Sequence, residues 1–495
     1  MIESKGYYKI FTVAIIAFWL VIIGLLVKRT YLDSHGLSHP PALAHPGKTD
    51  FIPGQGWMGI YMGKDKIGYS VTTVQKMNDV YLVSEKILMK LRVMDTPQKI
   101  DIVTDSVINQ DFSLKSFRFR LQSGVVRFRA EAEVKGNEMD LHIDSVGRKI
   151  RKTIPFKTTP YLSSSLRFVL MRDGLSVGKE FSLPIFDPST MSNNVMTVNV
   201  EGKERIKIDD KMVLAYRLKE SFKGVTVKAW ISEEGKILRE ESPMGIVLIK
   251  ETREKALTEN WEEGPGLDII ASTAVPVNTS IKRPKSVKYL KVRLEGFPLD
   301  DFNFASRRQV LKGDILEITQ EEINTDNPDP LRVKGRGFER YLASSLFVQS
   351  NAPEIIEEAN KIIGGERDSV EKTRLLMDRV YKTIEKKPTI SIPSALETLK
   401  SKVGDCNEHT ILFTALTRAV GIPTRIVTGI VLFEDSFLYH TWAEIYEGKW
   451  ISIDPTMNQF PADATHIGFV EGELDKQVEM MKVIGNLRVE ILEYK

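Results

Sequence analysis

Apolar and polar residues alternate along much of the chain between residues 57 and 255. In V-R-F-R-A-E-A-E-V, every second residue is apolar, so one side of the segment carries Val126, Phe128, Ala130, Ala132 and Val134. Similar patches recur at residues 81–93, 195–201, 213–218 and 226–232. A period of two with short connections predicts an antiparallel, strongly curved sheet. This region contains no chemical motif, and we expect it to be a scaffold or binding domain.

Helical spacing replaces this alternation after about residue 340. In P-E-I-I-E-E-A-N-K-I-I-G-G, residues 353–365, the apolar residues form one stripe and two glycines end the segment, which predicts a helix. Two more helices are expected, one opening with Asp368 and Glu371 and the other with Ser394 and Glu397. Both pairs have the spacing of a capping box, in which two side chains of the first turn accept backbone N–H groups.

A fourth helix is predicted over residues 405–420. Its sequence is mostly apolar, and Gly421 and Pro423 follow it, as is typical of a helix end. Asp405 is a suitable N-cap residue, so Cys406 falls in the first turn. There, the free backbone amides and the helix dipole favour a thiolate over a thiol.

A β-hairpin with a three-residue loop is predicted over residues 437–454. The loop pairs Tyr446 with Trp450. This register places His440 and Asp454 on one face as diagonal neighbours, about 7 to 8 Å apart at the backbone. The two side chains are therefore expected to be able to meet.

Residues 10–27, I-F-T-V-A-I-I-A-F-W-L-V-I-I-G-L-L-V, carry no charge. Their length just suffices to cross a bilayer. We expect an uncleaved transmembrane anchor, because the run exceeds a usual signal-peptide core and no small-x-small cleavage site closely follows it; a cleaved signal peptide is the alternative. Positive charges flank both ends equally and do not orient the segment. We assume that the short N-terminal tail is cytoplasmic and that the soluble part is periplasmic or otherwise extracytoplasmic.

The chain has 495 residues and a formal net charge of +3. This length is too great for one core, so two or three domains are expected. Lysine and arginine are spread widely and form no basic stripe with interleaved aromatic residues, which argues against nucleic acid as a partner. Cys406 is the only cysteine. It cannot form an internal disulfide, so it is a core residue, a metal ligand or a reactive thiol.

A cysteine nucleophile needs a base, and histidine titrates in the useful range. The histidine in turn needs a carboxylate that fixes its tautomer and holds its charge. Cys406, His440 and Asp454 would supply this set in that chain order. Zinc is an alternative, because it accepts the ligand types that Cys406, His409, His440 and Asp454 offer.

The segments G-D-C-N-E-H-T-I-L-F-T-A-L-T-R-A-V-G-I-P-T-R and H-T-W-A-E-I-Y-E-G-K-W-I-S-I-D-P-T resemble the catalytic core of the transglutaminase-like superfamily. That family shows G-D-C before a helix ending R-x-x-G-I-P-x-R, then H-x-W-x-E, then a strand ending D-P-T. The resemblance covers about residues 340–470. It implies that Cys406 is the nucleophile, His440 the base and Asp454 its partner. It also implies a papain-like architecture, in which the helix bearing the cysteine packs on an antiparallel sheet.

The resemblance further implies a thiol enzyme that acts on amide bonds of a protein or peptide substrate through a thioester, with no cofactor and no metal. The reaction would be that of a peptidase or amidase, or a transglutaminase-type acyl transfer. A catalytically inactive binding or scaffold module of the cell envelope is the alternative. Asn407, His409 and Trp442 are expected to line or support the cleft, with structural roles as the alternative.

The expected fold class is α+β, with a membrane anchor, a mainly antiparallel β domain and a C-terminal papain-like core. The expected segments are a tail at 1–9, a transmembrane anchor at 10–27, a linker at 28–56, a β-rich domain at 57–255, a linker at 256–286, a connecting β region at 287–339 and a catalytic domain at 340–495.

Overall fold

The computed structural model describes residues 54–93, 96–124, 126–145, 148–243, 245–258, 273–306, 308–323, 337–387 and 391–495. These residues divide into two compact units, an N-terminal one that ends before residue 269 and a C-terminal one that begins there. The predicted anchor and residues 28–53 of the expected linker lie outside the described residues. The last three residues of that linker, 54–56, belong to the first strand of the β-rich domain. Within the described ranges, no helix is both long enough and apolar enough to span a membrane.

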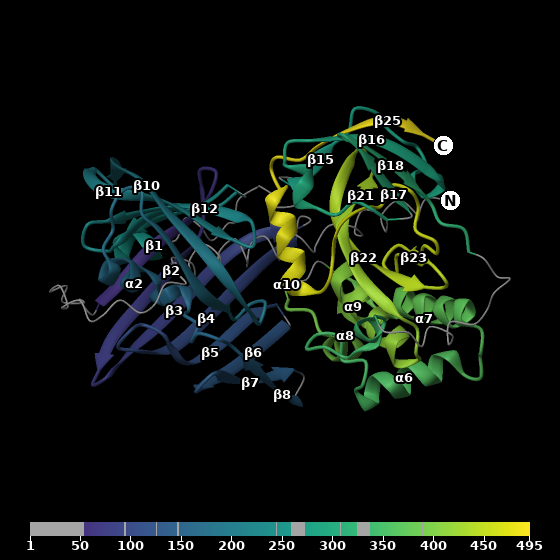
Figure 1. Cartoon of the computed structure of the whole chain (residues 1–495), viewed down its shortest axis with the longest axis horizontal. Helices are drawn as coiled ribbons and strands as arrows, with labels where there is room; N and C mark the ends of the chain where they lie inside the picture. The colour runs from purple at the N-terminus through teal and green to yellow at the C-terminus, as the bar shows by residue number, and fades with distance from the viewer. Residues whose placement is uncertain are drawn as a thin grey trace. The chain divides into compact units, whose positions relative to one another are not determined.

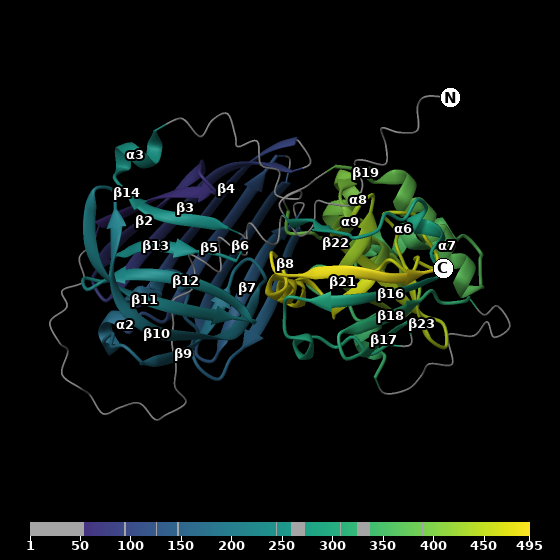
Figure 2. The same ribbon diagram turned by 90° about the horizontal axis from the view of Figure 1, so that it is seen from above.

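The N-terminal unit is built on one sheet of fourteen strands, in the order β8-β7-β6-β5-β4-β3-β2-β1-β14-β13-β12-β11-β10-β9 (Figures 1 and 2). All neighbouring strands run antiparallel, which confirms the sheet predicted from the alternation. The strands are β1 (Gly54–Met62), β2 (Asp65–Met77), β3 (Val80–Val93), β4 (Thr96–Asn109), β5 (Leu114–Ser123), β6 (Val126–Lys135), β7 (Glu138–Ser145), β8 (Arg148–Pro155), β9 (Glu180–Asp187), β10 (Ser192–Ile208), β11 (Lys211–Phe222), β12 (Val225–Ser232), β13 (Ile237–Glu241) and β14 (Ile246–Glu251).

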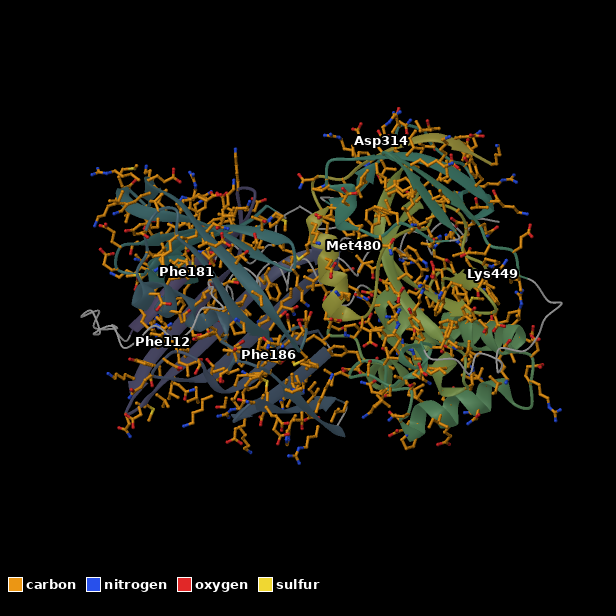
Figure 3. The ribbon with its side chains drawn as sticks, viewed as in Figure 1. Phe112, Phe181, Phe186, Asp314, Lys449 and Met480 are labelled. Atoms are coloured by element: carbon orange, nitrogen blue, oxygen red, sulfur yellow. The ribbon has the colours of Figure 1, made fainter. Side chains whose placement is uncertain are left out.

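The apolar face of this sheet forms the core of the N-terminal unit. Phe128, Ala130 and Ala132 of β6 are buried, as their alternation predicts. Phe186 lies in this unit (Figure 3). Its ring packs on that of Phe117 with centroids 5.4 Å apart. Two short helices, α2 (Leu166–Asp173) and α3 (Arg253–Leu257), complete the unit as described, with a 3-10 turn before α2.

The C-terminal unit contains a second antiparallel sheet, in the order β15-β22-β21-β24, with β23 paired to β22. The helix α9 lies against β21 and β22 (Figure 1). This is the helix-on-sheet arrangement expected of the catalytic core. The elements are β15 (Val275–Pro276), β21 (Thr424–Phe433), β22 (Ser436–Tyr446), β23 (Trp450–Ile453), β24 (Ile467–Glu471), α5 (Glu339–Leu342), α6 (Pro353–Ile363), α7 (Ser369–Thr383), α8 (Ala395–Ser401) and α9 (Cys406–Ala419).

A third sheet, in the order β17-β18-β16-β25, brings distant parts of the sequence together (Figure 2). Its strands are β16 (Tyr289–Glu295), β17 (Gln309–Lys312), β18 (Ile315–Thr319) and β25 (Arg488–Tyr494). The segment expected as a connecting β region is therefore part of the C-terminal unit. The expected linker before it also contributes a strand, because β15 pairs with β22. The remaining elements are the paired β19 (Glu385–Lys386) and β20 (Val403–Gly404), α10 (Leu474–Gln477) and the 3-10 turns η3 (Pro284–Ser286), η4 (Leu299–Asp301) and η6 (Val478–Lys482).

The predicted helix starts lie where the sequence indicates, although their caps differ. The Asp368 side chain accepts the N–H of Glu371 at 2.8 Å, as expected of an N-cap. Ser394 precedes α8 but makes no cap hydrogen bond. Its hydroxyl instead donates to the Oε1 atom of Gln349 at 3.3 Å. The competing acceptor comes from a distant segment and is not visible in the local sequence.

Gly429 allows β21 and β24 to approach closely. A Cβ atom on Gly429 would lie 1.9 Å from the carbonyl oxygen of Ile467. We expect Gly429→Ala to lower the free energy of unfolding by about 2 kcal/mol, because backbone would have to move. Gly365→Ala is the matched control, since a Cβ at that exposed glycine meets nothing within 4 Å. Equal thermal unfolding of the two variants would contradict the prediction.

Candidate active site

The start of α9 is fixed by a reciprocal capping box around Cys406. The Asp405 side chain accepts the N–H of Asn407 at 3.0 Å. In return, the Glu408 Oε2 atom accepts the N–H of Asp405 at 2.9 Å. The hydroxyl of Ser391 donates to the other oxygen of Glu408. The cysteine therefore stands in the first turn of a helix whose end is held on both sides, as predicted.

The hairpin of β22 and β23 has the predicted register, with Tyr446 opposite Trp450. Asp454 follows the end of β23 and forms an isolated bridge with Gln459. Its Oδ1 atom accepts the backbone N–H groups of Thr456 at 2.7 Å and Met457 at 2.9 Å. These contacts fix the orientation of the carboxylate and leave its Oδ2 atom available to accept other hydrogen bonds.

The three predicted catalytic residues form one continuous line of contacts. The Sγ atom of Cys406 lies 2.7 Å from the Nδ1 atom of His440. The Nε2 atom of His440 lies 2.7 Å from the Oδ2 atom of Asp454. A carboxylate can only accept, so Nε2 carries the proton and Nδ1 is free to accept the thiol proton. This is the tautomer that a histidine base requires.

A second histidine contacts the same carboxylate oxygen. The Nε2 atom of His466 lies 3.1 Å from the Oδ2 atom of Asp454, and its Nδ1 atom lies 3.3 Å from the Oδ1 atom of Asp463. His466 stands in no motif and twelve residues beyond Asp454, so the sequence alone does not indicate a role for it. The turn that brings it back depends on Gln459, whose backbone pairs with Asp454.

Two family models match the chain. Residues 357–455 match the transglutaminase-like superfamily, and residues 59–252 match a protein of unknown function, DUF3108. Residues 357–455 are a transglutaminase-like domain. The match confirms the resemblance predicted from the motifs, and the matched residues include Cys406, His440 and Asp454. No curated protein matches the chain.

Three solved structures are similar to parts of the chain. One is a candidate cysteine protease from Cytophaga hutchinsonii, with 16% identity, a TM-score of 0.27 and coverage of 42% of this chain and 86% of that chain. A β-barrel-like DUF1849 protein from Brucella abortus has 12% identity, a TM-score of 0.32 and coverage of 40% and 95%. A candidate protease from Parabacteroides distasonis has 10% identity, a TM-score of 0.19 and coverage of 54% and 71%. TM-scores this low support no inference about the present chain.

Burial governs the electrostatics of the transglutaminase-like domain. Cys406 is 1% exposed. Burial, followed by the charge of Asp405, raises the pKa of its thiol well above the ordinary value, and a backbone hydrogen bond from Thr441 only partly opposes this. The lowered pKa predicted from the helix N-terminus is therefore wrong, because burial outweighs the helix dipole. The resting site therefore holds Cys406 as a neutral thiol.

The two histidines keep Asp454 ionised. Burial alone would raise the pKa of Asp454, but the charges and hydrogen bonds of His440 and His466 hold it well below its usual range. Burial alone would lower the pKa of His466, but the charge of Asp463 and the hydrogen bond to Asp454 raise it to about 9. A carboxylate and an imidazolium therefore persist side by side in the interior.

The three predicted supporting residues lie on the elements that carry Cys406 and His440. Asn407 and His409 are buried on α9, and Trp442 is buried on β22. The Nδ1 atom of His409 donates to the carbonyl of Asp405 at 2.5 Å, and burial lowers the pKa of His409 to about 3. The ring of Trp442 stacks on that of His440 at 6.1 Å and meets that of His466 edge-on at 5.2 Å. These rings shield the line of contacts from water.

The residues that lie close enough to hold a metal ion together differ from the set considered in the sequence. Among the described residues, His440, Asp454 and His466 have ligand atoms that all lie within 4.8 Å of one another. However, Asp454 contacts the two histidines at 2.7 and 3.1 Å, which are hydrogen-bond lengths. A metal ion would have to replace these hydrogen bonds. The donor set therefore fits a proton-sharing network better than a zinc centre.

Glu397 provides a test of the electrostatics around α9. Burial, followed by the charge of Glu408, raises its pKa to about 7. A carboxyl group with a raised pKa in the folded state loses stabilisation as pH rises from its unfolded pKa of about 4.3 through 7. We expect Glu397→Gln to increase protection of the α9 amides relative to wild type at pH 8 and to have little effect at pH 5. Hydrogen exchange measured by mass spectrometry checks this, with exposed Glu357→Gln as the control. An equal change at both pH values would contradict it.

Proposed function

We propose that the chain is a cysteine enzyme that cleaves amide bonds through a thioester acyl-enzyme, and that its N-terminal segment anchors it in a membrane. The observation that supports this proposal is the line of contacts from Cys406 through His440 to Asp454. Each member has the chemical type that its role requires, and the contacts follow the order of proton transfer. A buried core cysteine would need neither histidine nor carboxylate beside it.

In the first half-reaction, the Sγ atom of Cys406 attacks the carbonyl carbon and forms a carbon–sulfur bond. The thiol proton passes to the Nδ1 atom of His440, and Asp454 stabilises the resulting imidazolium. Collapse of the tetrahedral intermediate breaks the carbon–nitrogen bond. His440 then returns the proton to the leaving amine, which departs and leaves a thioester on Cys406.

In the second half-reaction, a nucleophile attacks the thioester and His440 accepts its proton. Water gives a carboxylic acid, as in a peptidase or amidase. A primary amine gives a new amide, as in a transglutaminase-type transfer. In both cases the carbon–sulfur bond breaks, and the released thiolate of Cys406 recovers its proton from His440. The substrate class is a protein or peptide, since both reactions begin at an amide carbonyl.

The burial of Cys406 favours a second function, that of an inactive binding module of the cell envelope. A thiol that is 1% exposed meets no substrate until the site opens. Its raised pKa also opposes ionisation at neutral pH. An enzyme must both expose and ionise this thiol in order to react, whereas a binding module needs to do neither.

Alkylation of Cys406 separates the two functions, because the chain has one cysteine. We expect iodoacetamide to label the wild-type protein at pH 7, and His440→Ala to slow labelling about a hundredfold, since the variant lacks the base. Labelling is measured by intact mass between pH 5 and 10. His142→Ala is the matched control, because His142 is half-exposed in the N-terminal sheet.

The binding module predicts a different result. Wild type and His440→Ala would then label at the same rate, and only near or above the ordinary thiol pKa of about 8.5. A thiol that reacts in urea but at no pH in the folded protein would also support it. Either outcome would overturn the proposed enzyme.

A further inference from the structure

His466 is held between two carboxylates, and this arrangement defines its protonation state. Its Nε2 atom faces Asp454 at 3.1 Å and its Nδ1 atom faces Asp463 at 3.3 Å. Ionised carboxylates only accept hydrogen bonds, so both contacts are satisfied only when both ring nitrogens carry protons. The geometry therefore makes His466 an imidazolium. It is 0% exposed, and no water competes for these contacts.

The surroundings of Cys406 are strongly negative without this cation. Asp405, Asp454 and Glu408 each act to raise the pKa of Cys406. A nucleophilic thiolate in such a place would face several carboxylates and have few opposing charges. His440 becomes positive only when it takes up the thiol proton. A permanent positive charge next to Asp454 would offset part of the negative field of these carboxylates at every stage of the reaction.

We propose that His466 is a positioning residue of the site, a constitutive imidazolium that balances Asp454 and thereby weakens the negative field that opposes a thiolate on Cys406. The inference rests on the proposed function. His466 does not touch the reacting atoms: it acts through Asp454, whose Oδ2 atom it shares with His440. Asp463 completes this arrangement by accepting a hydrogen bond from the second protonated ring nitrogen of His466.

The fold holds Asp463 as firmly as it holds Asp454. The Oδ1 atom of Asp463 accepts the N–H of Thr465 at 2.8 Å and its hydroxyl at 2.5 Å. The N–H of Asp463 donates to the side chain of Gln459 at 2.9 Å. The guanidinium of the buried Arg308 donates to its backbone carbonyl. The second carboxylate is therefore anchored independently of the first.

Other ionisable groups also act on this network, and they shape its pH dependence. The His440 ring lies 5.8 Å from that of His466, so their positive charges oppose each other once His440 is protonated. Lys386 acts on Asp454 and His409, and burial lowers its pKa to about 8. Lys285 acts on Lys386 and donates to the carbonyl of Met457.

The experiment compares the pH profile of Cys406 alkylation in the full-length protein, wild type and His466→Gln. Loss of a nearby positive charge raises the pKa of the thiol. We expect the midpoint of labelling to move to higher pH by about one unit. His142→Gln is the matched control and leaves the midpoint in place.

Asp463→Asn tests the same inference without removing the histidine. The amide has the shape of the carboxyl group and its oxygen can still accept from Thr465, so the packing is kept. His466 then holds its second proton less tightly, and we expect an alkaline shift in the same direction as for His466→Gln. A purely structural role for His466 predicts no shift in this variant.

A direct measurement covers the case in which the thiol does not react. In ¹⁵N-histidine NMR spectra of the wild-type protein, the signals absent from His466→Gln identify His466 among the seven histidines. Two protonated ring nitrogens at pH 7 support the inference. A single protonated nitrogen, or unshifted labelling in both variants, overturns it and leaves His440-dependent labelling intact. Labelling that is independent of His440 overturns the proposed function instead.

Discussion

The buried carboxylate of Asp454 is the constraint on which the rest of the site depends. A buried charge is strongly unfavourable unless hydrogen bonds and counter-charges surround it. Here, two backbone N–H groups of the following turn occupy one oxygen, and two histidines occupy the other. The turn and both histidines are therefore held by a single group. Each of them would lose a hydrogen bond if Asp454 moved away.

Hydrogen bonds also satisfy the buried polar groups at the N-terminus of α9, on the other side of the Cys406 thiol. Asp405 and Glu408 satisfy the backbone amides of the first turn and exchange hydrogen bonds with each other's backbone. This gives a rigid start to the helix, but it adds negative charge beside Cys406. The site combines precise positioning with an electrostatic field that opposes a thiolate. The histidines on β22 and before β24 supply the opposite charge.

Short-range features of the sequence account for the parts of the site that could be predicted. Asp405 and the apolar run after it predict the helix that carries Cys406, and the three-residue loop predicts the pairing of Tyr446 with Trp450. The antiparallel sheet of the N-terminal unit follows from its alternating residues in the same way. His466 could not be found like this, because its position depends on a turn stabilised by hydrogen bonds that no local pattern signals. The burial of Cys406, which reverses the expected direction of its pKa shift, is likewise a property of the assembled fold.

The pairing of β16 with β25 has a consequence for the order of folding. Leu290 lies opposite Tyr494, so this contact closes a loop that contains α9, the hairpin and both histidines. Contacts between such distant residues form slowly, because the entropy of loop closure must be overcome first. The third sheet therefore closes only after α9 and the hairpin have been synthesised, and the surroundings of Cys406 are incomplete until then. With a single cysteine in the sequence, this delay carries no risk of an incorrect internal disulfide.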